Sequence, residues 1–295
     1  MKKETNNLIT FLILCFAAVV LCVAAVLTSF DFESDELEIT FVDVGQGDCT
    51  YIKTPCNIRI FIDGGEEDSY DKYLKKFLLR RFVSNINLGI VTHFHSDHAG
   101  GIISMVEDDI IENVICPERA KETLIEEKLY QTAEAHNVKV ITSEFDDVIY
   151  SGDDGVVIKT LFPNKGLYNN KGDNYNENNN SLVLMLEYAG KKFLFTGDLE
   201  QEAEEAICQM FDLSADVLKV AHHGSSDSSC KQFVDAVSPE YAVISCEADN
   251  SYRFSKKDVL RRFELCKAKI FRTDRDGDIT FSVSKNGEIK IKKEK

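Results

Sequence analysis

Three histidines and one aspartate, His93, His95, Asp97 and His98, lie within six residues directly after an apolar run at 88–91. In an extended chain, residues two apart point to the same side, so His93 and His95 would direct two ring nitrogens at one point. If a helix begins at Asp97, Asp97 and His98 reach a second point nearby. Imidazole nitrogens and carboxylate oxygens are ligands that zinc, manganese and iron accept in proteins. The spacing therefore predicts a metal site at a strand end rather than a surface cluster of histidines.

Two later segments place the same ligand types at strand ends. Asp198 follows an apolar strand pattern at 193–195. An isolated buried carboxylate is costly, and a carboxylate that bridges two cations has the partners it needs. His222 and His223 follow another apolar run at 216–221. We therefore expect Asp198 and this second pair of imidazoles near the first cluster.

The elements that must position these residues follow from the hydrophobic periodicity. Alternating runs at 37–42, 49–53 and 58–62 predict an antiparallel meander, which ends in Asp63 and two glycines. Those glycines indicate either a backbone that passes close to the metal cleft or a plain tight turn, and the sequence leaves both open. Further along, the pattern predicts helices at 73–82, 100–106, 118–136 and 200–210, and strands or hairpins at 88–91, 113–116, 138–142, 148–162, 181–188, 193–195, 216–221 and 282–291.

The first part of the chain has an uncharged apolar run at 8–30. It is long enough for a membrane-spanning helix, which needs about 20 apolar residues. Because lysines precede the run and acidic residues follow it, the positive-inside rule predicts a single-pass protein of the cell membrane, with residues 1–7 in the cytoplasm and a domain at 31–295 outside. The alternative is a cleaved signal peptide, whose apolar core is usually shorter, about 7–15 residues.

The composition limits the partners of the domain. A formal net charge of −16 disfavours a surface that binds nucleic acid broadly by electrostatics. A phosphodiester gripped locally is compatible with this charge, because metal ions supply their own positive field. The nine cysteines include no CxxC pair, so the sequence predicts neither a disulfide framework nor a cysteine zinc site.

Six segments in order along the chain resemble the metallo-beta-lactamase-fold hydrolases, and within them the hydrolase domain of the competence DNA-uptake protein ComEC. The most specific is His-x-His-x-Asp-His at 93–98, and its combination with Thr-Gly-Asp at 196–198 and His-His-Gly-Ser at 222–225 is more specific still. The resemblance implies a four-layer alpha-beta/beta-alpha sandwich with a dinuclear metal cleft at one edge of the sheets. The other matching segments are 41–48, 180–184 and 272–274.

The resemblance also implies a role for each ligand. His93 and His95 would hold one divalent ion, zinc or manganese. Asp97 and His98 would hold the other, Asp198 would bridge the two ions, and one of His222 and His223 would complete the second site. The remaining imidazole could donate to the negative charge that develops on the substrate, so Asp97, His222 and His223 are the expected catalytic residues.

Two departures from the family pattern bear on the site. The third histidine of the first metal site, expected just before the strand at 181–188, is absent, and an asparagine run ending at Asn180 stands there. We expect water or Asn180 to take its place. A His-Pro pair of the ComEC-like proteins is missing at 250–255, which affects substrate contacts more than metals.

Together these features predict a membrane-anchored extracellular hydrolase that uses a metal-bound hydroxide on a phosphodiester, such as single-stranded DNA or a cell-wall polymer. Acyl hydrolysis by the same nucleophile is an open alternative. A different class of function is a non-catalytic metal-binding surface protein or DNA-uptake accessory module. Retention of both aspartates and both later histidines favours the enzyme, because stability alone does not require an open polar cleft.

Overall fold

The computed structural model describes residues 2–29, 36–118, 123–164, 175–248 and 255–295, with only the backbone at 2–9 and 24–29. It divides into two units, Met1–Ser34 and Asp35–Lys295. In the first unit the apolar run lies in one helix, α1 (Lys2–Ser29). Within the described residues, no helix combines the length and apolar character that crossing a membrane requires. The membrane anchor at 8–30, with the orientation derived from it, stays a prediction.

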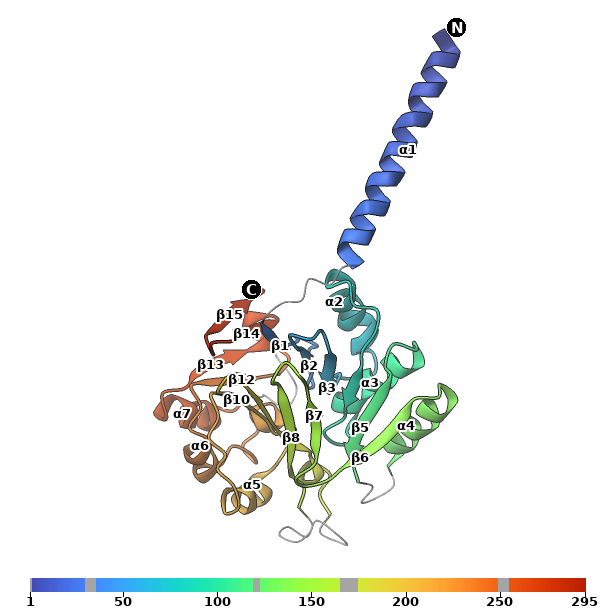
Figure 1. Cartoon of the computed structure of the whole chain (residues 1–295). Helices are drawn as coiled ribbons and strands as arrows, with labels where there is room; N and C mark the ends of the chain where they lie inside the picture. Colours follow the sequence, from blue (N-terminus) through green and yellow to red (C-terminus); the bar gives the residue numbers. More distant parts are fainter. Residues whose placement is uncertain (1, 30–35, 119–122, 165–174, 249–254) are drawn as a thin grey trace. The chain divides into compact units, whose positions relative to one another are not determined.

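The second unit begins with an eight-stranded sheet in the order β15-β14-β1-β2-β3-β4-β5-β6 (Figure 1). The three N-terminal strands pair antiparallel, as the meander predicted, and β3 to β6 are parallel to one another. The parallel half places the ends of several strands at one edge of the sheet. The strands are β1 (Leu37–Phe41), β2 (Thr50–Lys53), β3 (Arg59–Ile62), β4 (Leu88–Ile90), β5 (Asn113–Pro117), β6 (Lys139–Ser143), β14 (Ile279–Val283) and β15 (Ile289–Lys293).

A second sheet of seven strands follows the order β13-β12-β11-β10-β9-β8-β7. Here β7 to β10 are antiparallel, whereas β10 to β13 are parallel. The predicted hairpins at 148–162 and 181–195 are confirmed. The strands are β7 (Val148–Ser151), β8 (Val157–Phe162), β9 (Val183–Tyr188), β10 (Lys191–Phe195), β11 (Val217–Lys219), β12 (Tyr241–Ile244) and β13 (Lys269–Arg272).

Alternation along the strands explains how the two sheets pack. In β9, Leu184 and Leu186 belong to a core shared by both sheets, whereas Val183 and Met185 belong to a core formed with helices of the second sheet. Successive residues of a strand point to opposite faces, so one strand serves both layers. The same division holds in β2 and β3 of the first sheet, where Ile52 and Ile60 face the shared core and Tyr51 and Phe61 face the helices. The predicted four-layer sandwich of helices, sheet, sheet and helices is confirmed.

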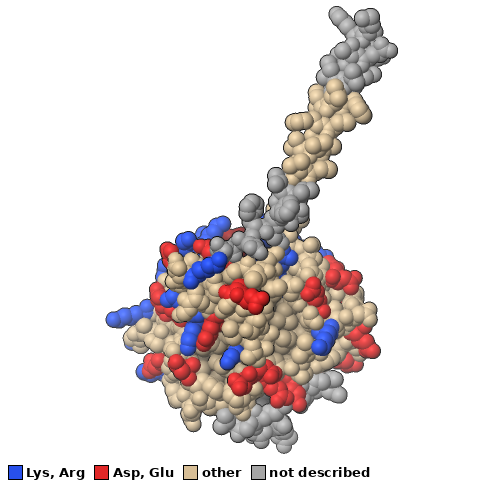
Figure 2. Space-filling model, in the orientation of Figure 1, with Lys and Arg blue, Asp and Glu red and all other residues tan. Residues whose placement is uncertain are grey.

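Helices cover the outer face of each sheet (Figure 1). The first sheet packs against α2, α3 and α4, and the second against α5, α6 and α7. On the face drawn in Figure 2, the acidic and basic side chains of the second unit are interspersed rather than gathered by sign. The helices and helical turns are η1 (Tyr70–Leu74), α2 (Lys75–Arg80), α3 (Ser96–Glu107), α4 (Leu124–Ala135), η3 (Asn178–Asn180), α5 (Gln201–Cys208), η4 (Ala221–Gly224), α6 (Lys231–Val237), α7 (Lys257–Leu265) and α8 (Thr273–Asp276).

Helix α3 begins earlier than the predicted helix at 100–106. It starts at Ser96, so Asp97 and His98 lie in its first turn. Helix α4 begins only at Leu124, where Thr123 caps it by accepting a hydrogen bond from the Glu126 amide. Part of the predicted helix at 118–136, residues 119–122, lies outside the described residues.

Candidate metal centre

The predicted ligands come from four chain segments that end at the same edge of the sandwich. His93 and His95 follow β4, and Asp97 and His98 open α3. The other ligands come from the second sheet, after β10 and β11. Parallel strands bring their carboxyl ends to one edge of a sheet, and this is where ligands bind in open alpha/beta folds. The parallel halves of both sheets therefore position the centre.

The first group consists of His93, His95 and Asp198, whose ligand atoms all lie within 4.8 Å of one another. His93 Nε2 lies 3.0 Å from His95 Nδ1 and 4.0 Å from Asp198 Oδ2. His93 is fully buried, whereas His95 is exposed. This group is thus open to solvent on the side of His95.

The second group consists of Asp97, His98 and His223, again within 4.8 Å of one another. His223 Nε2 lies 3.2 Å from Asp97 Oδ2 and 3.6 Å from Asp198 Oδ2. His98 Nε2 lies 3.2 Å from Asp198 Oδ1. Asp198 therefore lies between the two groups, with oxygens directed at both.

The structure distinguishes the roles of His222 and His223, which the sequence could not do. Both have a positive φ, 51° at His222 and 53° at His223, which turns the backbone sharply after β11. The His223 ring is buried in the second group, whereas His222 is partly exposed. His222 Nε2 lies 3.8 Å from Asp198 Oδ2, and its Nδ1 lies 3.7 Å from Glu200 Oε1. In the described part of the chain, the residue groups that could hold a metal ion include His223 and do not include His222.

The residues fit divalent metal ions. His98 Nε2 and Asp198 Oδ1 are buried and lie 3.2 Å apart, yet neither atom forms a hydrogen bond. A buried polar atom without a partner costs about 1–3 kcal/mol. A cation between them would satisfy both, and imidazole with carboxylate is a ligand set that zinc and manganese accept. The predicted divalent metals are therefore chemically compatible with the site, and their identity stays a prediction.

Charges within the centre shift pKa values in opposite directions in the two groups. Burial, with the neighbouring His98 charge, holds the pKa of His93 well below its usual value of 6.5. Burial also disfavours the charged form of His98, but Asp198 and Asp63 outweigh it and raise its pKa well above 6.5. Burial opposes ionisation of Asp198 too, but the imidazoles around it hold its pKa well below the usual value. Without metal, the second group is therefore a compact cluster of opposite charges.

Asp63 supports the second group from behind, a role that the sequence left open. His98 Nδ1 lies 2.9 Å from Asp63 Oδ2, and Asp63 accepts hydrogen bonds from the Thr92 amide at 2.8 Å and the Thr92 hydroxyl at 2.7 Å. The residue after Asp63 must be a glycine for a steric reason. A Cβ at Gly64 would lie 2.6 Å from the Ile102 amide nitrogen, so the glycine lets α3 approach closely. Of the two alternatives for the glycines after Asp63, a close backbone approach or a plain tight turn, the structure shows the close approach.

Asp48 and Lys219 are two further residues that sequence reasoning did not assign to the centre. Asp48 Oδ2 forms an ion pair of 2.6 Å with Lys219 Nζ, and its Oδ1 lies 3.2 Å from His223 Nδ1. Both side chains are buried. One signal was present in the sequence, because Lys219 is the single charged residue in the apolar run 217–221. A lysine is almost never fully buried unless it is paired, so a lysine in an apolar run predicts a buried acidic partner.

The asparagines that stand where the family pattern has a histidine ligand form hydrogen bonds with other residues. Asn178 and Asn176 donate to the two carboxylate oxygens of Glu200 at 2.7 and 2.6 Å. Asn180 donates to the Glu118 carbonyl oxygen at 3.3 Å. The run thus fixes Glu200, which faces His222. A part for Asn180 in the first site stays a prediction, and the segments 165–174 and 249–254 lie outside the described residues.

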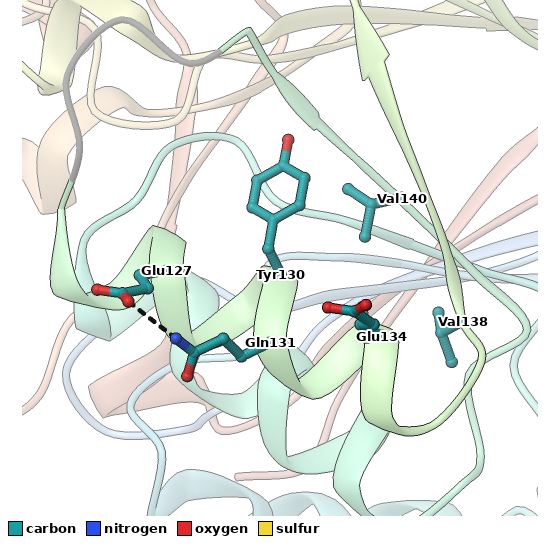
Figure 3. A pocket seen from close by; sticks show the side chains of 7 residues that line it. Glu127, Tyr130, Gln131, Glu134, Val138 and Val140 are labelled. Carbon is teal, nitrogen blue, oxygen red and sulfur yellow. Dashed lines mark hydrogen bonds between the residues drawn. The ribbon is translucent and has the colours of Figure 1, made fainter.

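Two pockets differ in their relation to the centre. The pocket in Figure 3, of about 520 Å³, lies between α4 and the start of β6 and contains none of the predicted ligands. A larger pocket of about 760 Å³ is lined by Asn176, Asn179 and Glu200. Because Glu200 faces His222, this second pocket borders the centre. Its other lining residues are Gln201, Glu202, Glu205, Ser226 and Asp227.

Comparison with known proteins gives concordant results. The family described as the metallo-beta-lactamase superfamily matches residues 42–248. The chain is 29% identical over 265 residues to ComE operon protein 3 of Bacillus subtilis (strain 168), covering 84% of this chain and 33% of that protein. It is 35% identical over 136 residues to competence protein ComA of Neisseria gonorrhoeae, covering 45% of this chain and 19% of that protein. The chain spans about a third or less of the length of these relatives.

Solved structures support the fold. The metallo-beta-lactamase fold protein YhfI from Bacillus subtilis has a TM-score of 0.53 to this chain at 13% identity, covering 87% of this chain and all of that protein. Similarity at this level of identity concerns the fold alone.

Proposed function

The chain belongs to the metallo-beta-lactamase superfamily, and from this membership we propose that it is a metal-dependent phosphodiesterase. The competence-protein relatives confirm the resemblance of its hydrolase domain to that of ComEC. The observation that carries the proposal is Asp198, which lies between two groups of imidazole and carboxylate ligands. A single carboxylate shared by two such groups is what a pair of divalent ions requires.

Two bound ions would supply an activated water and Lewis-acid stabilisation of both the attacking and the leaving oxygen, which suits phosphodiester hydrolysis. The protein's own part is to place these ions and to handle protons. His93, His95, Asp97, His98, Asp198 and His223 would hold them.

Asp97 and His222 have the remaining roles. The Asp97 side chain keeps 21% of its surface exposed, and so it can orient an attacking water as well as bind metal. His222 lies beside Asp198 without belonging to either group, at the side where Glu200 and the larger pocket lie. It is placed to donate a proton or a hydrogen bond to negative charge that develops on the substrate.

The finer identity of the substrate and the location of the protein are parts of the same proposal. One relative is named a competence protein, so single-stranded DNA is the first nucleic acid to test, with a cell-wall phosphodiester polymer as the second. The net charge of −16 favours local recognition of one phosphodiester over binding along a long polyanion. We propose that the run at 8–30 anchors the domain on the outside of the cell membrane.

The decisive experiment is an assay of the full chain, purified in detergent and loaded with manganese or zinc. Substrates are bis(p-nitrophenyl) phosphate, a p-nitrophenyl ester and single-stranded DNA. We expect phosphodiester cleavage that Asp97→Ala and Asp198→Ala abolish and that Asp153→Ala, an exposed aspartate in a surface turn, leaves unchanged. Ester cleavage alone would replace the proposal with acyl hydrolysis. Bound metal without any cleavage would support the non-catalytic accessory function.

A further inference from the structure

We propose that Lys219 is a positioning residue, which acts through Asp48 to fix the imidazole of His223 so that its Nε2 faces the second metal group. The inference deepens the proposed function, on which it rests for the presence of metal. It assigns a purpose to a buried ion pair at the border of the centre, where Asp48 lies within 4.8 Å of ligand atoms of Asp198 and His223. Lys219, Asp48 and His223 come from β11, from the loop before β2 and from the turn after β11.

Lys219 is placed where an apolar side chain would be expected. It is the last residue of β11 and only 2% exposed. Its Nζ lies 2.6 Å from Asp48 Oδ2 and donates to the Val220 carbonyl oxygen at 2.9 Å. Replacing a buried ion pair with apolar residues of similar volume is often neutral or stabilising. A contribution to folding stability therefore does not explain why this ion pair is buried here.

Asp48 is held rigidly on both sides. Its amide donates to the Asp97 carbonyl oxygen at 3.1 Å, and its carbonyl oxygen accepts from the Gly65 amide at 2.8 Å. The loop approaches α3 so closely that a Cβ at Gly47 would lie 2.2 Å from the Asp97 carbonyl oxygen. Asp48 thus connects the start of α3, which carries two ligands, to the pair with Lys219.

The contacts of His223 show what this connection does. Its Nδ1 donates to the Ser245 carbonyl oxygen at 3.1 Å and lies 3.2 Å from Asp48 Oδ1. An acceptor and a negative charge at Nδ1 hold a proton on that nitrogen, so Nε2 is the nitrogen that gives up its proton and offers its lone pair when a cation binds. Nε2 lies 3.2 Å from Asp97 Oδ2, inside the second group.

A comparison with His98 explains why a lysine is needed here. The carboxylate behind His98, Asp63, is held by the neutral amide and hydroxyl of Thr92. Asp48 has a more crowded setting, since its ligand atoms lie within 4.8 Å of those of Asp198 and His223 and of those of Asp63 and His98. A fourth carboxylate in this small volume raises the repulsion unless a cation neutralises it. Lys219 supplies that cation from the side away from the metal positions.

The test compares three variants of the full chain in detergent by metal content and by the absorption spectrum of the cobalt-substituted protein. Lys219→Met leaves Asp48 charged and buried. Lys219→Met with Asp48→Asn leaves a neutral pair of similar shape. Lys191→Met is the matched control, because Lys191 pairs with Asp216 at the opposite end of the same strands.

We expect both Lys219 variants to bind the second ion about 10- to 100-fold more weakly, with the first ion retained and the cobalt spectrum changed. The control should bind two ions with the wild-type spectrum. Lys219→Met alone should also unfold at a lower temperature, and the double variant should recover this loss but not the metal affinity.

The inference is overturned if the double variant binds both ions with wild-type affinity and spectrum. It is equally overturned if the double variant fails to fold, since the pair would then be needed for folding rather than for positioning. Wild-type protein that binds two ions but cleaves no substrate would refute the proposed activity and leave this inference standing.

Discussion

The two metal groups use the same kinds of ligand but are held in different ways. In the second group each imidazole has a carboxylate behind it, Asp63 at His98 and Asp48 at His223. In the first group His93 Nδ1 faces a neutral hydroxyl, that of Thr92, at 3.2 Å, and His95 is exposed. Carboxylates behind imidazole ligands fix the ring and raise its basicity. The second group is therefore preorganised, whereas the first is open.

This difference agrees with what the sequence lacks. The family pattern has a third histidine for the first site, and this chain has asparagines there. With fewer supports and an exposed ligand, we expect the first ion to bind more weakly and to exchange faster than the second. Asp198 is the one ligand that both groups share, so it couples their affinities.

The largest effect should come from removing the shared ligand. Asp198→Ala should abolish binding of the first ion, weaken the second and lower the rate of hydrolysis by about 10²- to 10⁴-fold or more. Metal analysis by mass spectrometry, together with the phosphodiester assay, measures both. Retention of two ions by this variant would show that the groups do not share Asp198.

The next prediction separates the two neighbouring histidines. His223→Ala should remove the second ion, because its Nε2 lies within the second group. His222→Ala should keep both ions and lower kcat by about 10²-fold, as loss of a donor to developing charge typically does. Metal titration and steady-state kinetics on the two variants test this. Equal loss of metal in both would assign His222 to the centre as well.

The support behind His98 gives a smaller effect on one group only. Asp63→Asn keeps a side chain that accepts from Thr92 but removes the charge behind His98 Nδ1. The second ion should bind about 10- to 100-fold more weakly, with the first unaffected. Calorimetric titration with zinc resolves the two affinities. A change confined to the first ion would contradict the assignment of Asp63.

The two groups should respond to pH with opposite signs once a chelator removes the metal. Carboxylates raise the pKa of His223 to about 10 although burial opposes this, so its stabilisation is complete below about pH 6.5 and is lost as the pH rises toward 10. Burial lowers the pKa of His93 well below 6.5, so its contribution is complete above that value and is lost as the pH falls.

Thermal unfolding of the metal-free protein across this range measures both contributions. We expect each loss to lower the Tm by at least about 3 °C, since 1 kcal/mol corresponds to roughly 2–4 °C in a domain of this size. His223→Phe should remove the alkaline loss and His93→Phe the acidic one. Loss of the alkaline limb in both variants would show that the groups titrate as one.

The sequence was sufficient for the architecture and for naming the residues that the structure brings together, since both depend on local pattern. Strand ends, the glycine-rich turns and the His-x-His-x-Asp-His spacing are visible in a few consecutive residues. The short strands β12 and β13 escaped prediction, because four residues are too few to show a distinctive periodicity. The membrane anchor is a local pattern too, and it stays a prediction.

The supports of the centre could not be predicted in the same way, because they depend on contacts between distant segments. Lys219 and Asp48 form an ion pair between the two sheets, and no sequence motif around either residue predicts the other as its partner. The choice between His222 and His223 depends on two consecutive residues with positive φ, which sequence does not show. Asp63 was visible as a strand-end aspartate, but nothing in its neighbourhood in the sequence shows that it contacts His98 in the first turn of α3.

The smallest effect should come from the exposed ligand of the first group. His95→Ala removes an exposed side chain, and water can replace its contact with the buried His93 Nε2 on the open side of the first group, so the metal-free protein should change in unfolding free energy by no more than about 0.5 kcal/mol. The first ion should nevertheless be lost, because only His93 and Asp198 remain. Denaturant unfolding with a chelator, followed by metal titration, measures the two quantities in one preparation. A large loss of stability in the metal-free variant would mean that the first group is as preorganised as the second.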